Sequence, residues 1–353
     1  MLKAAKRFRG SNGPSLMAEP TPEQLAKLSY EERLAFSKKP LTSRIWDHLR
    51  REWQLYVMLA PLIIWMLLFL YKPMYGLQLA FKDFSLFRGV QASDWADVGE
   101  FFGLAIPGFE HFETLFSSDQ FMRALKNTAI LSAYSLLFGF PVPILLALMF
   151  NEIVNATFKR TAQTIVYLPH FISAVIIAGI VISAFSPSVG IVNTIIKFFG
   201  GDPVYFLTKP EWFRPIFIGT GIWQEAGFSS IVYLAAIAGV SPTLYESAVV
   251  DGASRWQMMW RITLPSILPT IIIMLIIRIG NLLEVSFEMI ILLYQPATYQ
   301  TADVVNTWIY RQGLQGGQYD LAAAAGLFNA VVAFVLVIGA NTISRRVTRT
   351  SLW

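Results

Sequence analysis

The chain has 353 residues, of which 55% are hydrophobic and 14% are charged, and its formal net charge is +5 at pH 7. This composition excludes an ordinary soluble protein, because one core cannot bury so much apolar surface, and it indicates an integral membrane protein. The sequence has no cysteine, which excludes disulfides, thiol catalysis and cysteine metal sites.

Residues 1–54 form a polar segment that precedes every apolar stretch and carries eleven of the 28 Lys and Arg residues. Within it, the stretch from Ile45 to Trp53 is amphipathic and brings tryptophan and arginine side chains to one face. We therefore predict a cytoplasmic N-terminal tail and an interfacial elbow in residues 1–54. The tail is interpreted as a tether or a regulatory segment.

Six stretches reach the roughly 20 mostly apolar residues that are needed to cross about 30 Å of hydrocarbon. Each is predicted to be a helix, because an open strand would leave its backbone polar groups unpaired in lipid. The stretches are residues 55–81, 128–150, 161–186, 215–240, 264–294 and 321–343. The predicted fold is an all-α integral membrane protein in which residues 55–353 form a six-span transmembrane domain.

The positions of Lys and Arg predict the orientation of the spans. The short connections on the side of the N-terminus are rich in these residues, whereas the three opposite connections together hold six. The positive-inside rule therefore places both termini and residues 241–265 in the cytoplasm. Membrane topology explains the excess of positive charge, so no nucleic-acid partner is expected.

Residues 82–121 form the largest predicted segment outside the membrane. They contain seven acidic residues against Lys82 and Arg88, and nine aromatic residues are interleaved with them. We predict a small extracytoplasmic cap. Two interpretations remain open, a solvated loop and a docking surface for an extracytoplasmic partner.

Residues 241–265, between the fourth and fifth spans, are polar and rich in small side chains. Ser241 and Pro242 predict the start of a helix, and Gly252 predicts its end, since glycine accepts a positive φ. A second short helix is expected from Ser254. Such a two-helix knob has a tip small enough to enter a groove on a partner outside the bilayer.

The spacing of Glu246, Ala248 and Gly252, followed after nine residues by Ile262-Thr263-Leu264-Pro265, resembles the cytoplasmic coupling loop (the EAA loop) of ABC-importer permeases. Ser247 stands where that family usually has Ala. The resemblance implies that the loop sits in a cleft of an ATP-binding subunit. The residues predicted to couple to the ATPase are Tyr245, Glu246, Ser247, Ala248, Asp251, Gly252, Ala253, Trp256, Leu264 and Pro265.

The chain itself lacks an ATP site by sequence. No Gly precedes a Lys-Ser or Lys-Thr pair, so the phosphate-binding P-loop is missing. We therefore predict a transport subunit rather than an enzyme, with ATP and Mg bound by a separate ATPase chain. No His, Asp or Glu cluster has the spacing of a metal site, so no metal is expected.

Further motifs resemble the subfamily of carbohydrate importers that takes up oligosaccharides and polysaccharide fragments, including the alginate importer. These motifs are Trp223–Phe228, Phe287–Ile290, Tyr310–Leu314, Ala325–Phe328 and Ser351–Trp353. The resemblance, over roughly residues 50–353, implies a type I ABC importer in the bacterial cytoplasmic membrane. It also implies a second permease subunit in a heterodimer, two ATPase subunits and an extracytoplasmic solute-binding protein. A permease for another solute class and a secondary transporter remain alternatives.

Polar side chains inside the predicted spans are costly unless they face a cavity or a partner. Asn281, Glu284 and Glu288 are three and four residues apart, so they are predicted to share one helical face. Carboxylates and amides hydrogen-bond sugar hydroxyls, and aromatic rings cover the C–H face of a sugar. The predicted substrate pathway comprises Trp223, Glu225, Phe228, Asn281, Glu284, Phe287, Glu288 and Asn329. A structural role stays open, with Arg278 paired to Glu284 or Glu225 and Asn329 joining helices.

Three prolines inside the spans, Pro141, Pro143 and Pro169, are predicted to kink or interrupt their helices. His170 follows the last of them. A hydrogen-bonded helix contact is the favoured interpretation of this histidine, ahead of a proton relay or a metal ligand.

Overall fold

The structure is a computed structural model that describes residues 50–101 and 104–348. The predicted tail and most of the predicted interfacial elbow lie outside the described residues. The described residues divide into two units, with the boundary between Tyr75 and Gly76. The described part of the first unit is a helical run of α5 (Trp53–Met66), the π-helical segment η1 (Leu67–Tyr71) and α6 (Lys72–Met74). Helix α5 buries none of its residues within the chain, as expected of an apolar helix surrounded by lipid.

The second unit begins with the predicted cap. After the 3-10 helix η2 (Tyr75–Phe81), the cap contains α7 (Gly89–Ala92), the antiparallel strands β1 (Val98–Phe101) and β2 (Leu104–Pro107), and α8 (Glu110–Ser117). In the hairpin, Val98 pairs with Pro107 and Phe101 with Leu104. The backbone N–H groups of Asp97 and Glu100 donate to carboxylates of α8, which fixes the hairpin on that helix. The cap is therefore a folded element.

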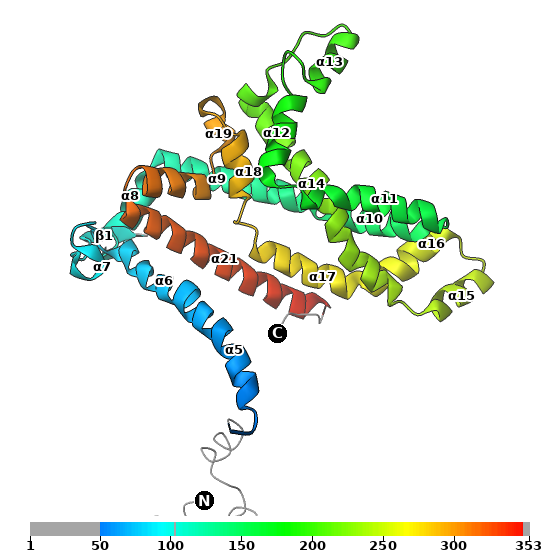
Figure 1. The fold of residues 1–353 in the computed structure, drawn as a ribbon, viewed down its shortest axis with the longest axis horizontal. Coiled ribbons are helices and arrows are strands. Elements are labelled where there is room, and N and C mark those ends of the chain that lie inside the picture. Colours follow the sequence, from blue (N-terminus) through cyan, green and yellow to red (C-terminus); the bar gives the residue numbers. More distant parts are fainter. Residues whose placement is uncertain (1–49, 102–103, 349–353) are drawn as a thin grey trace, which may run out of the picture. The chain divides into compact units, whose positions relative to one another are not determined.

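The rest of the second unit is helical (Figure 1). The first half contains α9 (Asp119–Tyr134), η3 (Ser135–Gly139), α10 (Pro141–Glu152), α11 (Ala156–Tyr167), η4 (Leu168–Phe171), α12 (Ala174–Ala184), α13 (Ile191–Phe198), η5 (Phe206–Thr208) and α14 (Pro210–Ala238). The second half contains α15 (Pro242–Val250), α16 (Arg255–Met258), η6 (Met259–Thr263), α17 (Leu264–Gly280), α18 (Phe287–Leu293), η7 (Pro296–Thr298), α19 (Tyr299–Ala302), α20 (Val305–Ile309), η8 (Tyr310–Gln315) and α21 (Tyr319–Thr348). The prediction of a helical membrane protein is confirmed, with the β1–β2 hairpin as an addition.

Four helical runs of the described chain are long and apolar enough to cross a membrane, and two further runs are bent. The four are Trp53–Phe81, Asp119–Glu152, Arg255–Gly280 and Tyr319–Arg346. The bent pairs are Ala156–Phe171 with Ala174–Ala184, at 102°, and Pro210–Ala238 with Pro242–Val250, at 70°. Each of the six predicted stretches overlaps one of these runs.

The predicted interruptions are present at two of the three prolines, Pro169 and Pro141. The 102° bend follows the 3-10 segment η4, which contains Pro169. Pro141 begins α10 after the π-helical segment η3 and the turn residue Phe140, whereas Pro143 lies within α10 and does not interrupt it. Both cases follow from proline's missing N–H and from the clash of its ring with the preceding turn.

The predicted continuous helix at residues 264–294 is wrong. Helix α17 ends at Gly280, and α18 begins at Phe287 after a stretch without helix. Consequently Asn281, Glu284 and Glu288 do not share one helical face. The carbonyl of Leu282, which has left the helical ladder, accepts a hydrogen bond from the hydroxyl of Ser132 on α9. This contact stabilises the break, because a freed carbonyl inside a membrane protein needs a donor.

The main apolar core joins α12, α14 and α18 through buried residues such as Ile177, Phe217 and Ile290. Helix α14 also crosses α11 closely. A Cβ atom at Gly227 would lie 2.0 Å from the backbone oxygen of Val166, so this crossing requires glycine. Helix α14 therefore has a fixed place at the centre of the second unit.

Candidate functional site

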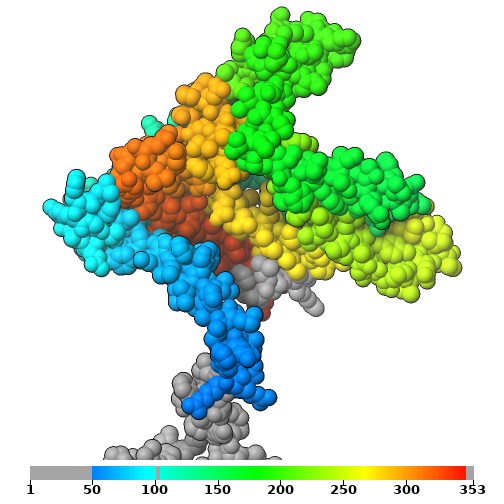
Figure 2. All heavy atoms as spheres, in the orientation of Figure 1, coloured from blue at the N-terminus to red at the C-terminus, as the bar shows by residue number. Residues whose placement is uncertain are grey.

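The predicted knob at residues 241–265 contains α15 and α16 and forms one end of the second unit (Figure 1; Figure 2). Ser241 occupies the N-cap position and Pro242 begins α15, as predicted, although the Ser241 hydroxyl contacts the Thr243 hydroxyl at 2.8 Å instead of capping. Gly252 has φ +78 and ends the helix. The N–H of Gly252 donates to the carbonyl of Val249 (3.0 Å), which begins a Schellman turn.

The second helix of the knob is continuous with the next span. Ser254 and Gln257 form a reciprocal capping box at the start of α16, with N···O distances of 3.3 and 2.8 Å. The helix then continues through the π-helical segment η6 into α17. The hydroxyl of Tyr245 on α15 lies 2.9 Å from that of Thr263, whose side chain is buried. This hydrogen bond ties the first helix of the knob to the base of α17.

The exposed surface of the knob differs in part from the prediction. The predicted coupling residues are exposed or half-buried, and the half-buried Leu264 packs against apolar core residues at the start of α17. Val250 is 87% exposed and Trp256 is 66% exposed, so the knob presents apolar surface. The carboxylates of Glu246 and Asp251 form no ion pair within residues 50–101 and 104–348. Val250 was not among the predicted coupling residues, because a valine in an apolar chain does not differ from its neighbours in the sequence.

A second feature is a cavity of about 440 Å³ between α9, η3, α10, α14 and the segment from α17 to α18. Ten polar residues line it. They are Ser132, Ser135, Gln224, Glu225, Ser229, Tyr233, Arg278, Asn281, Glu284 and Ser286. Three predicted pathway residues are therefore brought together, namely Glu225, Asn281 and Glu284.

Arg278 is held in this cavity by a hydroxyl. Its Nη2 atom donates to Ser135 Oγ at 2.8 Å. Among the described residues, no carboxylate lies within ion-pairing distance of its guanidinium, so the ion pair considered from the sequence is replaced by this neutral contact. Ser135 was not predicted, since a serine in an apolar span is common and shows no sign of its partner.

Glu225 is bound by His170. The Nδ1 atom of His170 lies 3.1 Å from Glu225 Oε2, and the imidazole stacks on Phe228 with ring centroids 3.9 Å apart and planes at 2°. His170 is thus a hydrogen-bonded helix contact, as favoured from the sequence. The Phe228 ring packs against His170 in this stack and does not line the cavity.

The other predicted pathway residues lie elsewhere. Trp223 lines a separate apolar groove of about 340 Å³ with Trp212. Trp223 and Glu225 are two positions apart in the helix, which places them about 200° apart around α14. Phe287 contacts the ring of Tyr310, and the Oδ1 atom of Asn329 is buried without a hydrogen-bond partner among the described residues. Glu288 is exposed outside the cavity lining.

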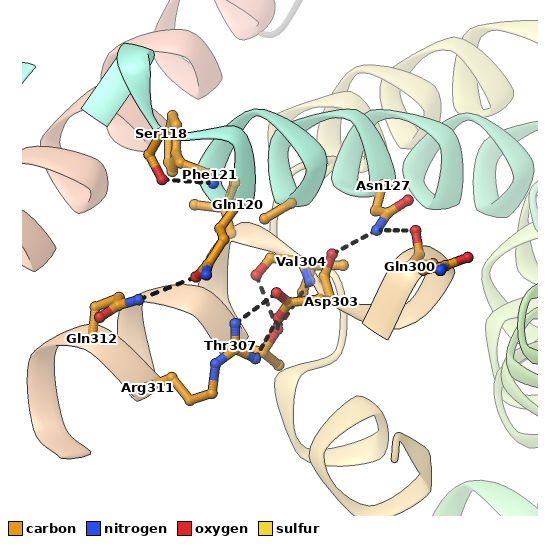
Figure 3. Close-up of polar contacts among 12 residues, drawn as sticks. Ser118, Gln120, Phe121, Asn127, Gln300, Asp303, Val304, Thr307, Arg311 and Gln312 are labelled. Carbon is orange, nitrogen blue, oxygen red and sulfur yellow. Dashed lines mark hydrogen bonds and ion pairs between the residues drawn. The ribbon is translucent and has the colours of Figure 1, made fainter. Parts of the chain in front are cut away.

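A buried ion pair organises residues 299–315 (Figure 3). Asp303 is fully buried and accepts two hydrogen bonds from Arg311, at 2.8 and 2.7 Å. Asn127 of α9 donates to the backbone oxygen of Asp303 at 2.9 Å, and Arg214 of α14 donates to Asn127 at 2.8 Å. The hydrogen bond to Asp303 raises the pKa of Arg311, against the lowering effect of burial. This network was not predicted, because Asn127 and Arg214 lie far from Asp303 and from each other in the chain.

The family described as the binding-protein-dependent transport system inner membrane component matches residues 139–349. The chain belongs to this family. The match includes the whole knob and the parts of α14 and α17 that line the cavity. Family membership confirms the prediction of a transport permease in the membrane that depends on a binding protein.

Known proteins resemble the chain over nearly its whole length. A polygalacturonan/rhamnogalacturonan transport system permease protein, YteP of Bacillus subtilis (strain 168), is 42% identical over 309 residues, which are 88% of this chain and 93% of YteP. A solved bacterial ABC transporter involved in the import of the acidic polysaccharide alginate has a chain that is 60% identical. The TM-score is 0.78, and the match covers 86% of this chain and 99% of that chain.

A second solved structure is the bacterial alginate ABC transporter in complex with alginate pentasaccharide-bound periplasmic protein. Its matching chain is 59% identical with a TM-score of 0.79, covering 88% of this chain and 100% of that chain. These matches confirm the predicted fold of an ABC-importer permease of type I.

Proposed function

We propose that the chain is the translocating subunit of an ATP-driven importer for an acidic oligosaccharide, and that the 440 Å³ cavity is its transmembrane binding site. The observation that carries this proposal is the convergence of a guanidinium, two carboxylates, amides and several hydroxyls from three helical regions on one cavity. Its volume lies within the range of about 300–1,000 Å³ that is usual for small-molecule sites. Two of the proteins similar to the chain are YteP, described as a polygalacturonan/rhamnogalacturonan transport system permease, and a transporter involved in the import of the acidic polysaccharide alginate.

The knob of residues 241–265 couples this cavity to a separate ATPase, which binds ATP and Mg. Support comes from its free carboxylates, its exposed Val250 and Trp256, and its continuity with α17. Burying apolar side chains and pairing the carboxylates with Arg or Lys of the ATPase would hold the knob in a groove. Movement of the ATPase would then displace α17, which carries Arg278 of the cavity at its other end.

In this proposal both termini and the knob face the bacterial cytoplasm, and the cap faces outward. The chain pairs with a second permease and two ATPase subunits, and a solute-binding protein delivers the sugar from outside. Binding of ATP favours the outward-open state, and hydrolysis returns the importer to the inward-open state.

The proposal is tested by uptake of uronic-acid oligosaccharide into vesicles that contain the full importer. Replacing Asn281 and Glu284 together by Ala is expected to lower uptake at least tenfold, while the loaded binding protein still stimulates ATP hydrolysis. The matched control is Glu288→Ala, an exposed carboxylate outside the cavity. Wild-type uptake by the double variant would refute the cavity as the pathway, and uptake by the purified chain without ATP would indicate a secondary transporter.

A further inference from the structure

Arg278 presents an unmatched positive charge inside a predicted membrane span. It lies in the last turn of α17, within the run Arg255–Gly280. A guanidinium does not lose its proton in proteins, so its charge has to be balanced by an anion, by water or by dipoles. Its side chain is exposed to the cavity rather than packed in the core.

Within residues 50–101 and 104–348, most of this guanidinium has no hydrogen-bond or ion-pair partner. The hydrogen bond to Ser135 Oγ, at 2.8 Å, uses one of five N–H donors. Of the two carboxylates in the cavity, Glu225 is bound by His170 at 3.1 Å. Glu284 lies within the helix break and, like Glu225, forms no ion pair with Arg278 in the described part of the chain. The cavity therefore contains a fixed cation whose second ligand is not supplied by these residues.

From this geometry we infer that Arg278 is a carboxylate-binding subsite of the cavity and binds the uronate group of the transported sugar. Ser135 orients the Arg278 side chain. The inference rests on the proposed function. The planar fork of a guanidinium matches the two oxygens of a carboxylate, and a neutral sugar leaves that fork unpaired. Asn281 and Glu284, which line the same cavity, accept hydrogen bonds from the sugar hydroxyls.

Ser135 has the features of a positioning residue. It begins the π-helical segment η3, and such wide turns occur frequently at functional sites. By holding one side of the guanidinium, its hydroxyl directs the remaining donors into the cavity. The discrimination between acidic and neutral sugars then depends on two side chains from different spans, Ser135 and Arg278.

A structural role for Arg278 makes a different prediction. A cation in the last turn of α17 also interacts favourably with the free carbonyl groups at that helix end. Lysine preserves this effect but lacks the planar fork, so Arg278→Lys separates the two roles. Arg278→Gln removes the charge while keeping a group that can donate to Ser135.

The test compares uptake of a uronic-acid oligosaccharide with uptake of its methyl ester, at concentrations that saturate the binding protein, in vesicles with the complete importer. Arg278→Gln is expected to lower the acid-to-ester uptake ratio at least tenfold, Arg278→Lys several-fold and Ser135→Ala about twofold to fivefold. Arg123→Gln, an exposed arginine of α9 outside the cavity, is expected to leave the ratio unchanged.

An unchanged ratio in Arg278→Gln would overturn the inference, as would wild-type selectivity in Arg278→Lys. An equal loss of both substrates in Arg278→Gln would assign Arg278 a structural role and would also overturn it. Failure of the wild-type importer to carry either sugar would instead refute the proposed function. Assembly of each variant with its ATPase, followed by size-exclusion chromatography, shows that the protein is folded.

Discussion

The hydroxyl groups of Tyr245 and Thr263 lie 2.9 Å apart and connect the first helix of the knob to the base of the next span. Helix α17 continues from there to Gly280. Its 17 residues extend about 25 Å, at 1.5 Å per residue. One rigid element therefore links the proposed ATPase contact to the proposed sugar cavity, and the following predictions depend on that link.

Tyr245→Phe is expected to weaken coupling without preventing assembly. The substitution removes one hydroxyl and leaves the Thr263 hydroxyl with its contact to the Met258 carbonyl at 3.5 Å. The ratio of sugar imported to ATP hydrolysed should fall about twofold to tenfold, because α15 can then move without α17. Tyr205→Phe, an exposed tyrosine far from the knob in sequence, serves as the control. An unchanged ratio in Tyr245→Phe would show that this hydrogen bond does not transmit force.

Gly252→Pro is expected to leave the chain in the membrane but to prevent binding of the ATPase. Proline requires φ near −65°, whereas Gly252 has φ +78 and donates its N–H to Val249. The matched control is Gly200→Pro, which introduces the same strain at φ +82 next to α13. Co-purification with the ATPase should be lost for Gly252→Pro and kept for Gly200→Pro. Equal co-purification of both variants contradicts the assigned role of the knob.

Much of the knob could be predicted because its signals are local. Pro242, Gly252 and Ser254 each determine a helix start or end through backbone geometry within a few residues. The cavity was predictable in part, since polar residues inside a span require a cavity or a partner. Glu225, Asn281 and Glu284 satisfy that expectation.

The remainder could not be read from local patterns, because it depends on contacts between distant residues. The helix break after Gly280 is supported by Ser132, which lies 150 residues before Leu282. The apolar pattern of residues 264–294 predicts one continuous helix, and in such a helix Glu288 would share a face with Asn281. Trp223 and Glu225 are close in sequence and were both predicted to line the substrate pathway. Residues two positions apart on a helix, however, point to nearly opposite sides.

Asp303→Ala is expected to destabilise the second unit. It leaves Arg311 largely buried without its carboxylate and costs about 3–5 kcal/mol, the usual cost of breaking a buried ion pair. Thermal unfolding of the purified importer in detergent should therefore begin at a lower temperature. Asp94→Ala, which breaks the exposed pair with Arg88, is the control and should change stability by less than about 1 kcal/mol.

The contribution of Arg311 to stability should not depend on pH in the physiological range. Its pKa is raised in the folded protein by the hydrogen bond to Asp303. A cation with a raised pKa contributes its full stabilisation below its unfolded pKa and loses it when the pH rises through the folded pKa. Both values lie far above neutrality for arginine. The difference in unfolding temperature between wild type and Arg311→Gln should therefore be the same at pH 6 and at about pH 8, and a difference that shrinks with rising pH would contradict this.

The central claim, that the knob lies in the cytoplasm and contacts a separate ATPase, is tested most directly by cysteine crosslinking. The natural chain contains no cysteine, so an introduced thiol has no background in this subunit. We expect Ser247→Cys to crosslink to the ATPase in the assembled importer and to be protected from a membrane-impermeant thiol reagent added outside intact cells. Phe87→Cys, in the fully exposed turn of the cap, should react with that reagent. Labelling of Ser247→Cys from outside, or its failure to crosslink in an importer that still transports sugar, would contradict the account.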